Sequence, residues 1–167
     1  CSIMPKLASM HFTSERLTLE QITPELARRI LVRDEQAGDA WHPEYPFADE
    51  LGPLRHLAQS EVTASVFSMY LIREDRSGLA IGGLGFFGPP DDHGCVESGY
   101  GLVESARGKG YATEAVSAAL EFAQANGARY AKADTAPDNL PSQRVLEKAG
   151  LKLVEKSGSA FYYAREL

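Results

Sequence analysis

The chain of 167 residues, 44% of them hydrophobic, is long enough for one domain around one sizeable core. Seventeen basic residues stand against twenty-three acidic ones, and the formal net charge of −6 argues against binding a phosphate backbone and mildly favours cationic partners. Two cysteines exclude a disulfide-rich scaffold, and because no apolar run approaches the roughly 18 residues of a spanning helix, we expect a cytoplasmic protein without nucleic-acid or membrane partners.

The chain opens with strand and helix signals that follow Met10. Residues 16–19 alternate polar and apolar side chains, which predicts a half-buried strand. Thr23 and Pro24 then mark the start of a helix, as an N-cap followed by proline at the first helical position. Residues 38–53 are rich in aromatic residues and proline without a period. They predict a loop, which either shapes a substrate pocket or is an ordinary packed loop.

The middle of the chain predicts one helix and an antiparallel meander. Residues 54–65 space their apolar side chains on one helical face. Residues 66–73 and 79–87 read as two strands joined by a turn, and 95–103 as a fourth strand after a second turn.

Helices and strands alternate in the last third of the chain. A helix is predicted over 112–126 and ends before Gly127, a strand over 130–135, and a helix over 141–149 that Gly150 closes. A hairpin around Gly158 completes the pattern. The order predicts a mixed α/β fold, with a central twisted sheet of about seven strands and helices on both faces. We expect a single domain over 10–167, and residues 1–9 are interpreted as a disordered or artificial N-terminal segment.

A glycine-containing turn connects the fourth strand to the longest helix. Glycine lets backbone amides approach a ligand, and amides at a helix N-terminus favour an anion, so the turn suits phosphate. A tight exposed turn with solvated basic side chains is the alternative. A nucleotide P-loop does not fit because Gly110 follows Lys109, and a dinucleotide fingerprint does not fit because Thr113 replaces its third small residue.

Two segments resemble one known family. Residues 107–115, Arg-Gly-Lys-Gly-Tyr-Ala-Thr-Glu-Ala, resemble the acetyl-coenzyme A pyrophosphate loop of GNAT acetyltransferases, Gln/Arg-x-x-Gly-x-Gly/Ala, although Ser105 stands at its first position. Residues 139–151 resemble the family's second cofactor segment, Asn-x-x-Ser-x-Arg-Val-Leu-Glu-Lys-x-Gly-Phe. That form is typical of the branch of ribosomal-protein N-terminal acetyltransferases of the RimJ and RimL type. Residues 13–19 are also similar to that branch.

The resemblance implies the GNAT acyl-CoA N-acyltransferase fold and a set of cofactor contacts. The backbone of the fourth strand is expected to bind the pantetheine arm, the glycine turn the pyrophosphate, and the second segment the thioester end. The implied contacts are Gly101, Leu102, Val103, Arg107, Gly108, Lys109, Gly110, Tyr111, Ala112, Thr113, Asn139 and Ser142.

Amine acetylation also needs a proton acceptor for the amine and a proton donor for the leaving thiolate. Glu97, on the fourth strand, is the candidate base; a solvated or structurally paired carboxylate is the alternative. The tyrosine that many relatives use as the donor is replaced by Leu146, so Ser142 is the candidate donor, with a helix cap as its alternative.

The resemblance therefore predicts an N-acetyltransferase that moves the acetyl group of acetyl-CoA to a primary amine, by direct transfer in a ternary complex and without a metal. The acceptor is either a protein N-terminal amine or a small-molecule amine, and a homodimer is compatible with the branch. The alternative is a non-catalytic acyl-CoA-binding sensor or interaction module, which would bind coenzyme A without turnover.

Overall fold

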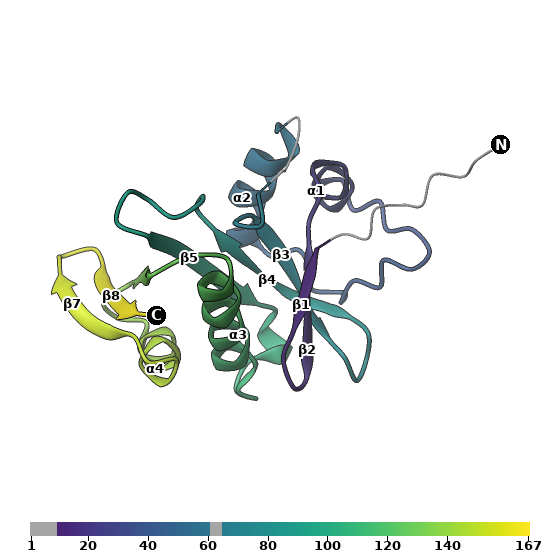
Figure 1. Ribbon diagram of the computed structural model, residues 1–167. Helices are drawn as coiled ribbons and strands as arrows, with labels where there is room; N and C mark the ends of the chain where they lie inside the picture. Colours follow the sequence, from purple (N-terminus) through teal and green to yellow (C-terminus); the bar gives the residue numbers. More distant parts are fainter. Residues whose placement is uncertain (1–9, 61–64) are drawn as a thin grey trace.

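An eight-stranded sheet dominates the computed structural model, which describes residues 10–60 and 65–167 (Figure 1). The strands follow the order β1-β2-β3-β4-β5-β6-β8-β7. Their bounds are β1 His11–Thr13, β2 Leu17–Gln21, β3 Met69–Glu74, β4 Ala80–Phe86, β5 Cys95–Leu102, β6 Tyr130–Thr135, β7 Lys152–Lys156 and β8 Phe161–Glu166.

The pairing of β5 with β6 differs from every other pairing in this sheet. It is parallel, whereas the remaining neighbours are antiparallel. It also covers only three residue pairs, from Cys95 opposite Tyr130 to Glu97 opposite Lys132. Beyond Glu97 the strand β5 continues to pair with β4 but no longer with β6. The sheet therefore opens between the two strands at its centre.

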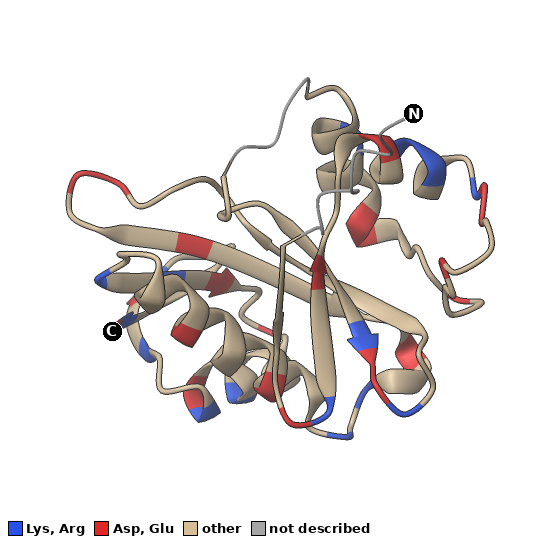
Figure 2. Ribbon diagram, turned by 45° about the vertical axis from the view of Figure 1, so that its right-hand side comes forward, with Lys and Arg blue, Asp and Glu red and all other residues tan. Residues whose placement is uncertain are grey.

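Helices cover both faces of the sheet (Figures 1 and 2). Helices α1, Pro24–Leu31, and α2, Ala48–Ala58, pack against each other on one face. Helices α3, Tyr111–Ala125, and α4, Leu140–Lys148, also touch each other, and they contact the strands β1, β2, β5 and β6. A short 3-10 helix, η1, Glu104–Ala106, precedes the glycine turn. The mixed α/β architecture expected from the sequence is confirmed.

The residues of α2 correct one sequence prediction. The helix begins at Ala48, not at 54, and ends at Ala58; residues 61–64 of the predicted helix lie outside the described residues. Its buried face consists of Glu50, Leu54 and Leu57. An apolar period cannot reveal a first buried position that carries a carboxylate, so the predicted start lay too late in the chain. The same correction shortens the predicted loop, which ends at Phe47.

Strand boundaries differ from expectation at two places. Strand β1, only three residues long, is the eighth strand that the sequence pattern did not reveal. Strand β3 begins at Met69, because residues 66–68 bend before they enter the sheet. The predicted strand over 130–135, the Thr23 cap and the closing hairpin are confirmed. The predicted segment 1–9 lies outside the described residues.

Lysine, arginine, aspartate and glutamate side chains are interspersed over the elements that Figure 2 shows. Over residues 10–60 and 65–167, no helix is both long and apolar enough to cross a bilayer.

Candidate active site

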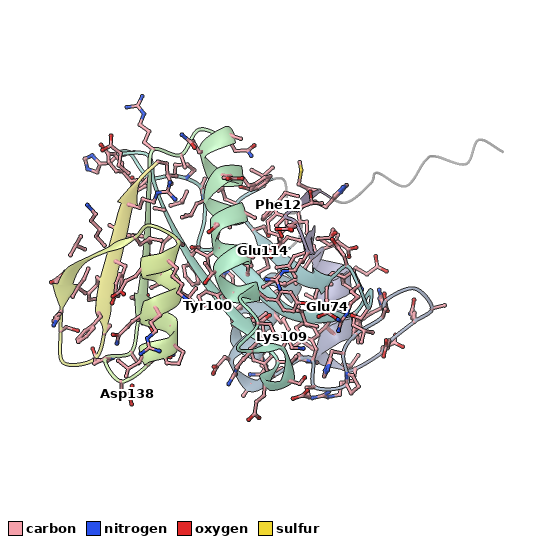
Figure 3. The ribbon with its side chains drawn as sticks, turned by 90° about the horizontal axis from the view of Figure 1, so that it is seen from below. Phe12, Glu74, Tyr100, Lys109, Glu114 and Asp138 are labelled. Atoms are coloured by element: carbon pink, nitrogen blue, oxygen red, sulfur yellow. The ribbon has the colours of Figure 1, made fainter. Side chains whose placement is uncertain are left out.

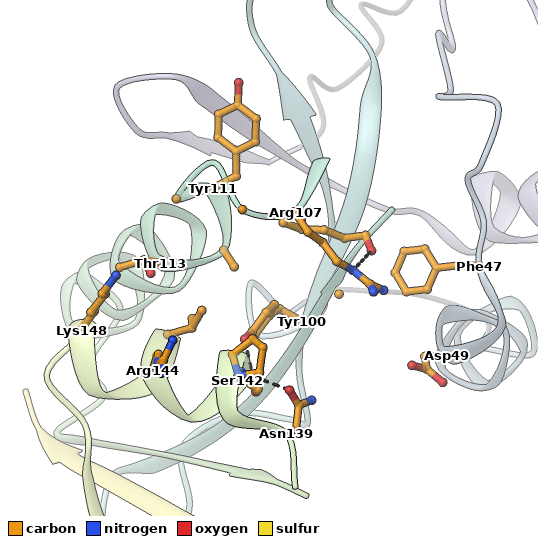
Figure 4. A pocket seen from close by; sticks show the side chains of 17 residues that line it. Phe47, Asp49, Tyr100, Arg107, Tyr111, Thr113, Asn139, Ser142, Arg144 and Lys148 are labelled. Carbon is orange, nitrogen blue, oxygen red and sulfur yellow. Dashed lines mark hydrogen bonds between the residues drawn. The ribbon is translucent and has the colours of Figure 1, made fainter. Parts of the chain in front are cut away.

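A cavity of about 670 Å³ lies where β5 separates from β6 (Figure 4). Strand β5, the glycine turn, the start of α3 and the first turns of α4 line it. Figure 4 places Phe47 and Asp49 on one side and Thr113, Arg144 and Lys148 on the other. Of the cofactor contacts expected from the sequence, those that line it are Gly101, Leu102, Arg107, Gly108, Gly110, Tyr111, Ala112, Thr113, Asn139 and Ser142.

The glycine turn presents bare backbone to this cavity. Gly108 and Gly110 adopt φ values of 77° and 82°, a left-handed conformation that favours glycine. Gly110 is the N-cap of α3, and no side chain among the described residues caps that helix end. The first amides of α3 therefore remain available to an anion.

Three cationic side chains line the same cavity. Arg107 extends from the turn, and its Nε donates to the carbonyl oxygen of Leu102 at 3.3 Å (Figure 4). Arg144 and Lys148 come from successive turns of α4. The positive groups and the free amides thus converge from two elements. This arrangement suits a ligand with more than one phosphate.

Contacts on the far side of the turn fix the start of α3. The hydroxyl of Tyr111 donates to Glu74 of β3 at 2.6 Å, and that bond is the main reason that the pKa of Glu74 is lowered. The guanidinium of Arg16 lies 4.4 Å from the centre of the Tyr111 ring and pairs with Glu114 at 2.8 Å. Figure 3 labels Glu74, Lys109 and Glu114. Lys109 does not line the cavity, unlike Arg107.

Ser105, at the first position of the predicted phosphate motif, is also outside the cavity. Its Oγ donates to Glu44 at 2.5 Å and lies 3.2 Å from Nε2 of His42. The serine thus ties the turn to the loop before α2 and contributes no side chain to the cavity.

The second segment places a hydroxyl pair in the cavity. Asn139 is the N-cap of α4, because its Oδ1 accepts from the amide of Ser142 at 3.2 Å. The alternative that Ser142 is the helix cap is therefore wrong. Instead, Tyr100 of β5 donates its hydroxyl to Oγ of Ser142 at 3.3 Å (Figure 4). Burial raises the pKa of Tyr100, so its hydroxyl keeps its proton.

Sequence reasoning did not single out Tyr100. The only signal was its place between Gly99 and Gly101, in a strand where alternation sends it to the opposite face from the glycines.

The ladder between β4 and β5 determines which backbone groups of β5 are free. The amide of Val103 donates to Ile81 at 2.8 Å, and the carbonyl of Glu97 accepts from Phe87 at 2.9 Å. Because bonding alternates along an antiparallel strand, Gly101 also turns its backbone groups toward β4, while those of Tyr100 and Leu102 face the opening. Of the three expected backbone contacts, the amide of Leu102 is available, whereas its carbonyl accepts from Arg107 and the amide of Val103 is bonded to Ile81.

Glu97 lies apart from these groups. Its side chain is 39% exposed, and its Oε2 lies 3.8 Å from Nζ of Lys132, opposite it on β6. It sits on the paired part of β5, before the strands separate, and lines neither of the two cavities described here. Its role as a base stays a prediction.

A second cavity, of about 780 Å³, adjoins the first on the α2 face of the sheet. The two share Phe47, Asp49 and Tyr100, so they meet at the opening beside β5. Apolar side chains of β3, β4 and α2 form much of its wall, and Glu50 of α2 is among the few ionisable groups there. The sequence did not predict a role for Glu50. The loop expected to shape a pocket contributes Phe47 to both cavities.

Comparison with known proteins finds a family with the same sequence features. Residues 16–152 match a family described as an acetyltransferase (GNAT) domain. A Bacillus subtilis (strain 168) protein named uncharacterized N-acetyltransferase YjdG is 31% identical over 153 residues, which cover 86% of this chain and 90% of that protein.

Solved structures share the fold at lower identity. The ribosomal L7/L12 alpha-N-protein acetyltransferase RimL, in complex with coenzyme A, superposes with a TM-score of 0.67 at 20% identity, covering 95% of this chain and 98% of that one. RimJ from Mycobacterium smegmatis, in complex with CoA-disulfide, gives a TM-score of 0.61 at 22% identity, covering 90% and 81%.

Proposed function

Because the chain belongs to the GNAT family of acetyl-CoA-dependent N-acetyltransferases, we propose that the cavity between β5 and β6 binds acetyl-CoA and that the acetyl group passes directly to a primary amine. One observation carries this proposal: an uncapped helix N-terminus, two left-handed glycines and three cations converge at an unpaired strand edge.

The residues present fit the cofactor in three parts. The amides at the start of α3 together with Arg107 suit the pyrophosphate, and Arg144 and Lys148 suit its remaining negative charge. The backbone groups of Tyr100 and the amide of Leu102 face the opening and suit the amides of the pantetheine arm, in the manner of an added strand. When bound, acetyl-CoA supplies an activated acetyl thioester.

Ser142 and Tyr100 then serve the leaving group. Since the Tyr100 hydroxyl donates to Oγ of Ser142, the proton of Ser142 is free to point into the cavity. The hydroxyl proton of Ser142 suits donation to the departing sulfur, and Tyr100 then gives its own proton to Ser142. The buried core position of Leu146 takes no part.

The Ser142→Ala variant should lower kcat about 100-fold, since general-acid assistance is worth at least that much, while Kd for coenzyme A changes less than about threefold. Thiol release from acetyl-CoA measures the rate and calorimetry measures the affinity. Ser105→Ala is the matched control, because that serine lies outside the cavity and should leave kcat nearly unchanged. Equal rates in both variants would remove Ser142 from the mechanism.

Lys148→Ala should weaken coenzyme A binding about three- to tenfold at low salt, and less as salt screens the charge. Lys148 lines the cavity, whereas Lys109 does not. Lys109→Ala is therefore the matched control, and its binding constant should stay close to that of the wild type. Titration calorimetry at two ionic strengths checks both. A larger loss in Lys109→Ala would restore the sequence-based assignment of that lysine to the phosphate site.

Two acceptor classes agree with the family: a protein N-terminal amine and a small-molecule amine. The acceptor of RimL, ribosomal L7/L12, belongs to that protein, because similarity at 20% identity extends to this chain only as a common fold. A panel of peptides and free amines, assayed for acceptor-dependent thiol release, discriminates the classes. Tight coenzyme A binding without turnover on any amine would favour the sensor alternative.

A further inference from the structure

The second cavity has an apolar wall that is continuous with the hydrophobic core. Phe67 and Phe86 meet edge to face there with ring centres 5.5 Å apart, and Met69 continues the wall along β3. Phe87, at the same cavity, is 64% exposed. An exposed phenylalanine beside a hollow of about 780 Å³ suits an apolar group of aromatic size.

One buried carboxylate stands where this cavity meets the cofactor cavity. Glu50 is only 6% exposed, yet it lines the second cavity. It lies over two glycines that face each other across β4 and β5: a Cβ at Gly83 would overlap its carboxyl group, and a Cβ at Gly101 would lie 3.9 Å from its Oε1. Only an open glycine pair lets the carboxyl group sit this close to the sheet.

Glu50 lacks the partners that normally accompany a buried carboxylate. Among the residues that the structure describes, no lysine, arginine or histidine forms an ion pair with it. Its hydrogen-bond partner is the hydroxyl of Tyr45, at 3.4 Å. A buried carboxylate without a cation destabilises the fold, so a structural role alone explains it poorly.

We infer that the second cavity holds the acceptor, that this acceptor carries an apolar group next to its primary amine, and that Glu50 takes the proton from the amine. The inference rests on the proposed function and names its substrate class and its proton acceptor. Phe47 and Asp49, shared by both cavities, stand between the apolar group and the thioester, and the carboxylate of Asp49 attracts the ammonium form.

The proton and electron balance is complete. The ammonium gives one proton to the Glu50 carboxylate, and the neutral nitrogen forms a C–N bond to the acetyl carbon while the C–S bond breaks. The thiolate sulfur takes one proton from Ser142, and the second nitrogen proton, lost as the amide forms, restores the proton of the Ser142–Tyr100 pair, so the products are an amide and a free thiol. One proton remains on Glu50 and passes to water.

The charged groups around Glu50 agree with this role. Burial is the largest cause that raises the pKa of Glu50 to about 7; the Tyr45 hydroxyl lowers it and the neighbouring Asp49 raises it. His56 lines the same cavity from α2, and Arg107 faces Asp49 across the shared opening. A base with a pKa near 7 is about half ionised at pH 7 and mostly ionised at pH 8, and it accepts a proton more readily than an ordinary glutamate does.

The test compares Glu50→Gln with Glu97→Gln, the same chemical change at the carboxylate that the sequence predicted as base. Thiol release with 2-phenylethylamine gives kcat/KM between pH 5.5 and 9, and calorimetry gives Kd for coenzyme A. In the wild type, kcat/KM should fall about tenfold per pH unit below about 7. Glu50→Gln should lose at least 100-fold at pH 8 and lose this limb, while Kd stays within about twofold. Glu50→Asp, which keeps the carboxylate, should recover the limb at a lower rate.

The substrate class is tested with pairs of acceptors that share a primary amine and differ in the group next to it. Kcat/KM for 2-phenylethylamine should exceed that for ethanolamine at least tenfold, since burying a phenyl group is worth that much, and the peptides Phe-Gly-Gly and Ser-Gly-Gly should show the same order if the acceptor is a peptide N-terminus.

Three results would overturn the inference while the proposed function stands. The acid limb of kcat/KM could be kept in Glu50→Gln or lost only in Glu97→Gln. The two free amines, and likewise the two peptides, could react at equal rates, or coenzyme A could bind with no turnover on any of the four acceptors. Failure to bind coenzyme A would instead refute the cofactor site itself.

Discussion

At pH 8 the Glu50→Gln variant should be more stable than the wild type, and at pH 4 this advantage should have disappeared. Burial raises the pKa of Glu50 from 4.5 to about 7, so the folded state holds a proton that the unfolded chain releases. Glu50 therefore contributes its full stability below pH 4.5 and loses it as pH rises toward about 7. The loss is about 3 kcal/mol, because one pKa unit is worth about 1.4 kcal/mol.

Urea denaturation of both proteins at pH 4, 6 and 8 measures this difference. Glu97→Gln makes the same chemical change at a carboxylate that is 39% exposed, and so reports the effect of the substitution without the cost of burial. A wild type as stable as Glu50→Gln at pH 8 would contradict the burial of an ionised carboxylate. The expected result would also show a trade-off between stability and activity, because Glu50 would weaken the fold at neutral pH and yet be retained as the base that the reaction needs.

Gly82→Ala should lower the free energy of unfolding by about 3 kcal/mol, the upper end for an overpacked core. A Cβ on Gly82 would overlap the carbonyl oxygen of Gly101 and lie 2.9 Å from Cδ2 of Leu102. The first contact is with backbone of the adjacent strand, so relief requires β5 to move. Coenzyme A affinity should fall as well, because Leu102 lines the cofactor cavity.

Gly85→Ala, on the same strand, is the control. Its Cβ would meet Cγ of Met69 at 3.4 Å, an ordinary contact, and the change should stay within about 1 kcal/mol. Urea unfolding and calorimetry with coenzyme A give both quantities for each variant. Similar losses in the two variants would mean that the close approach of β4 to β5 is not the cause.

Most of the residues in the two segments with a family resemblance line one cavity, and the sequence could single them out because their conformations are local. The conformations of Gly108 and Gly110 and the cap of α4 by Asn139 depend on a few consecutive residues, and such motifs keep their geometry wherever the fold places them. Lys109 shows the limit of this reasoning. It is adjacent to Gly108 and Gly110 in sequence, yet the turn directs it away from the cavity.

Of the groups proposed to act in catalysis, the sequence singled out Ser142 but not Tyr100 or Glu50, because these residues come from separate elements. Tyr100 and Ser142 are 42 residues apart and meet only where α4 packs beside the opened sheet. Glu50 has no motif, and a carboxylate at the first buried position of α2 looks like an ordinary surface residue in sequence.

By itself, the sequence determined the mixed α/β class, the positions of most elements and the tight glycine turn before α3, since periodicity, capping residues and glycine conformations act over a few residues. Only the tertiary structure decided where β5 parts from β6, which backbone groups remain free there, and which carboxylate is buried at the junction of the two cavities. Strand pairing and burial join residues far apart in the chain, and so they depend on the packed fold as a whole.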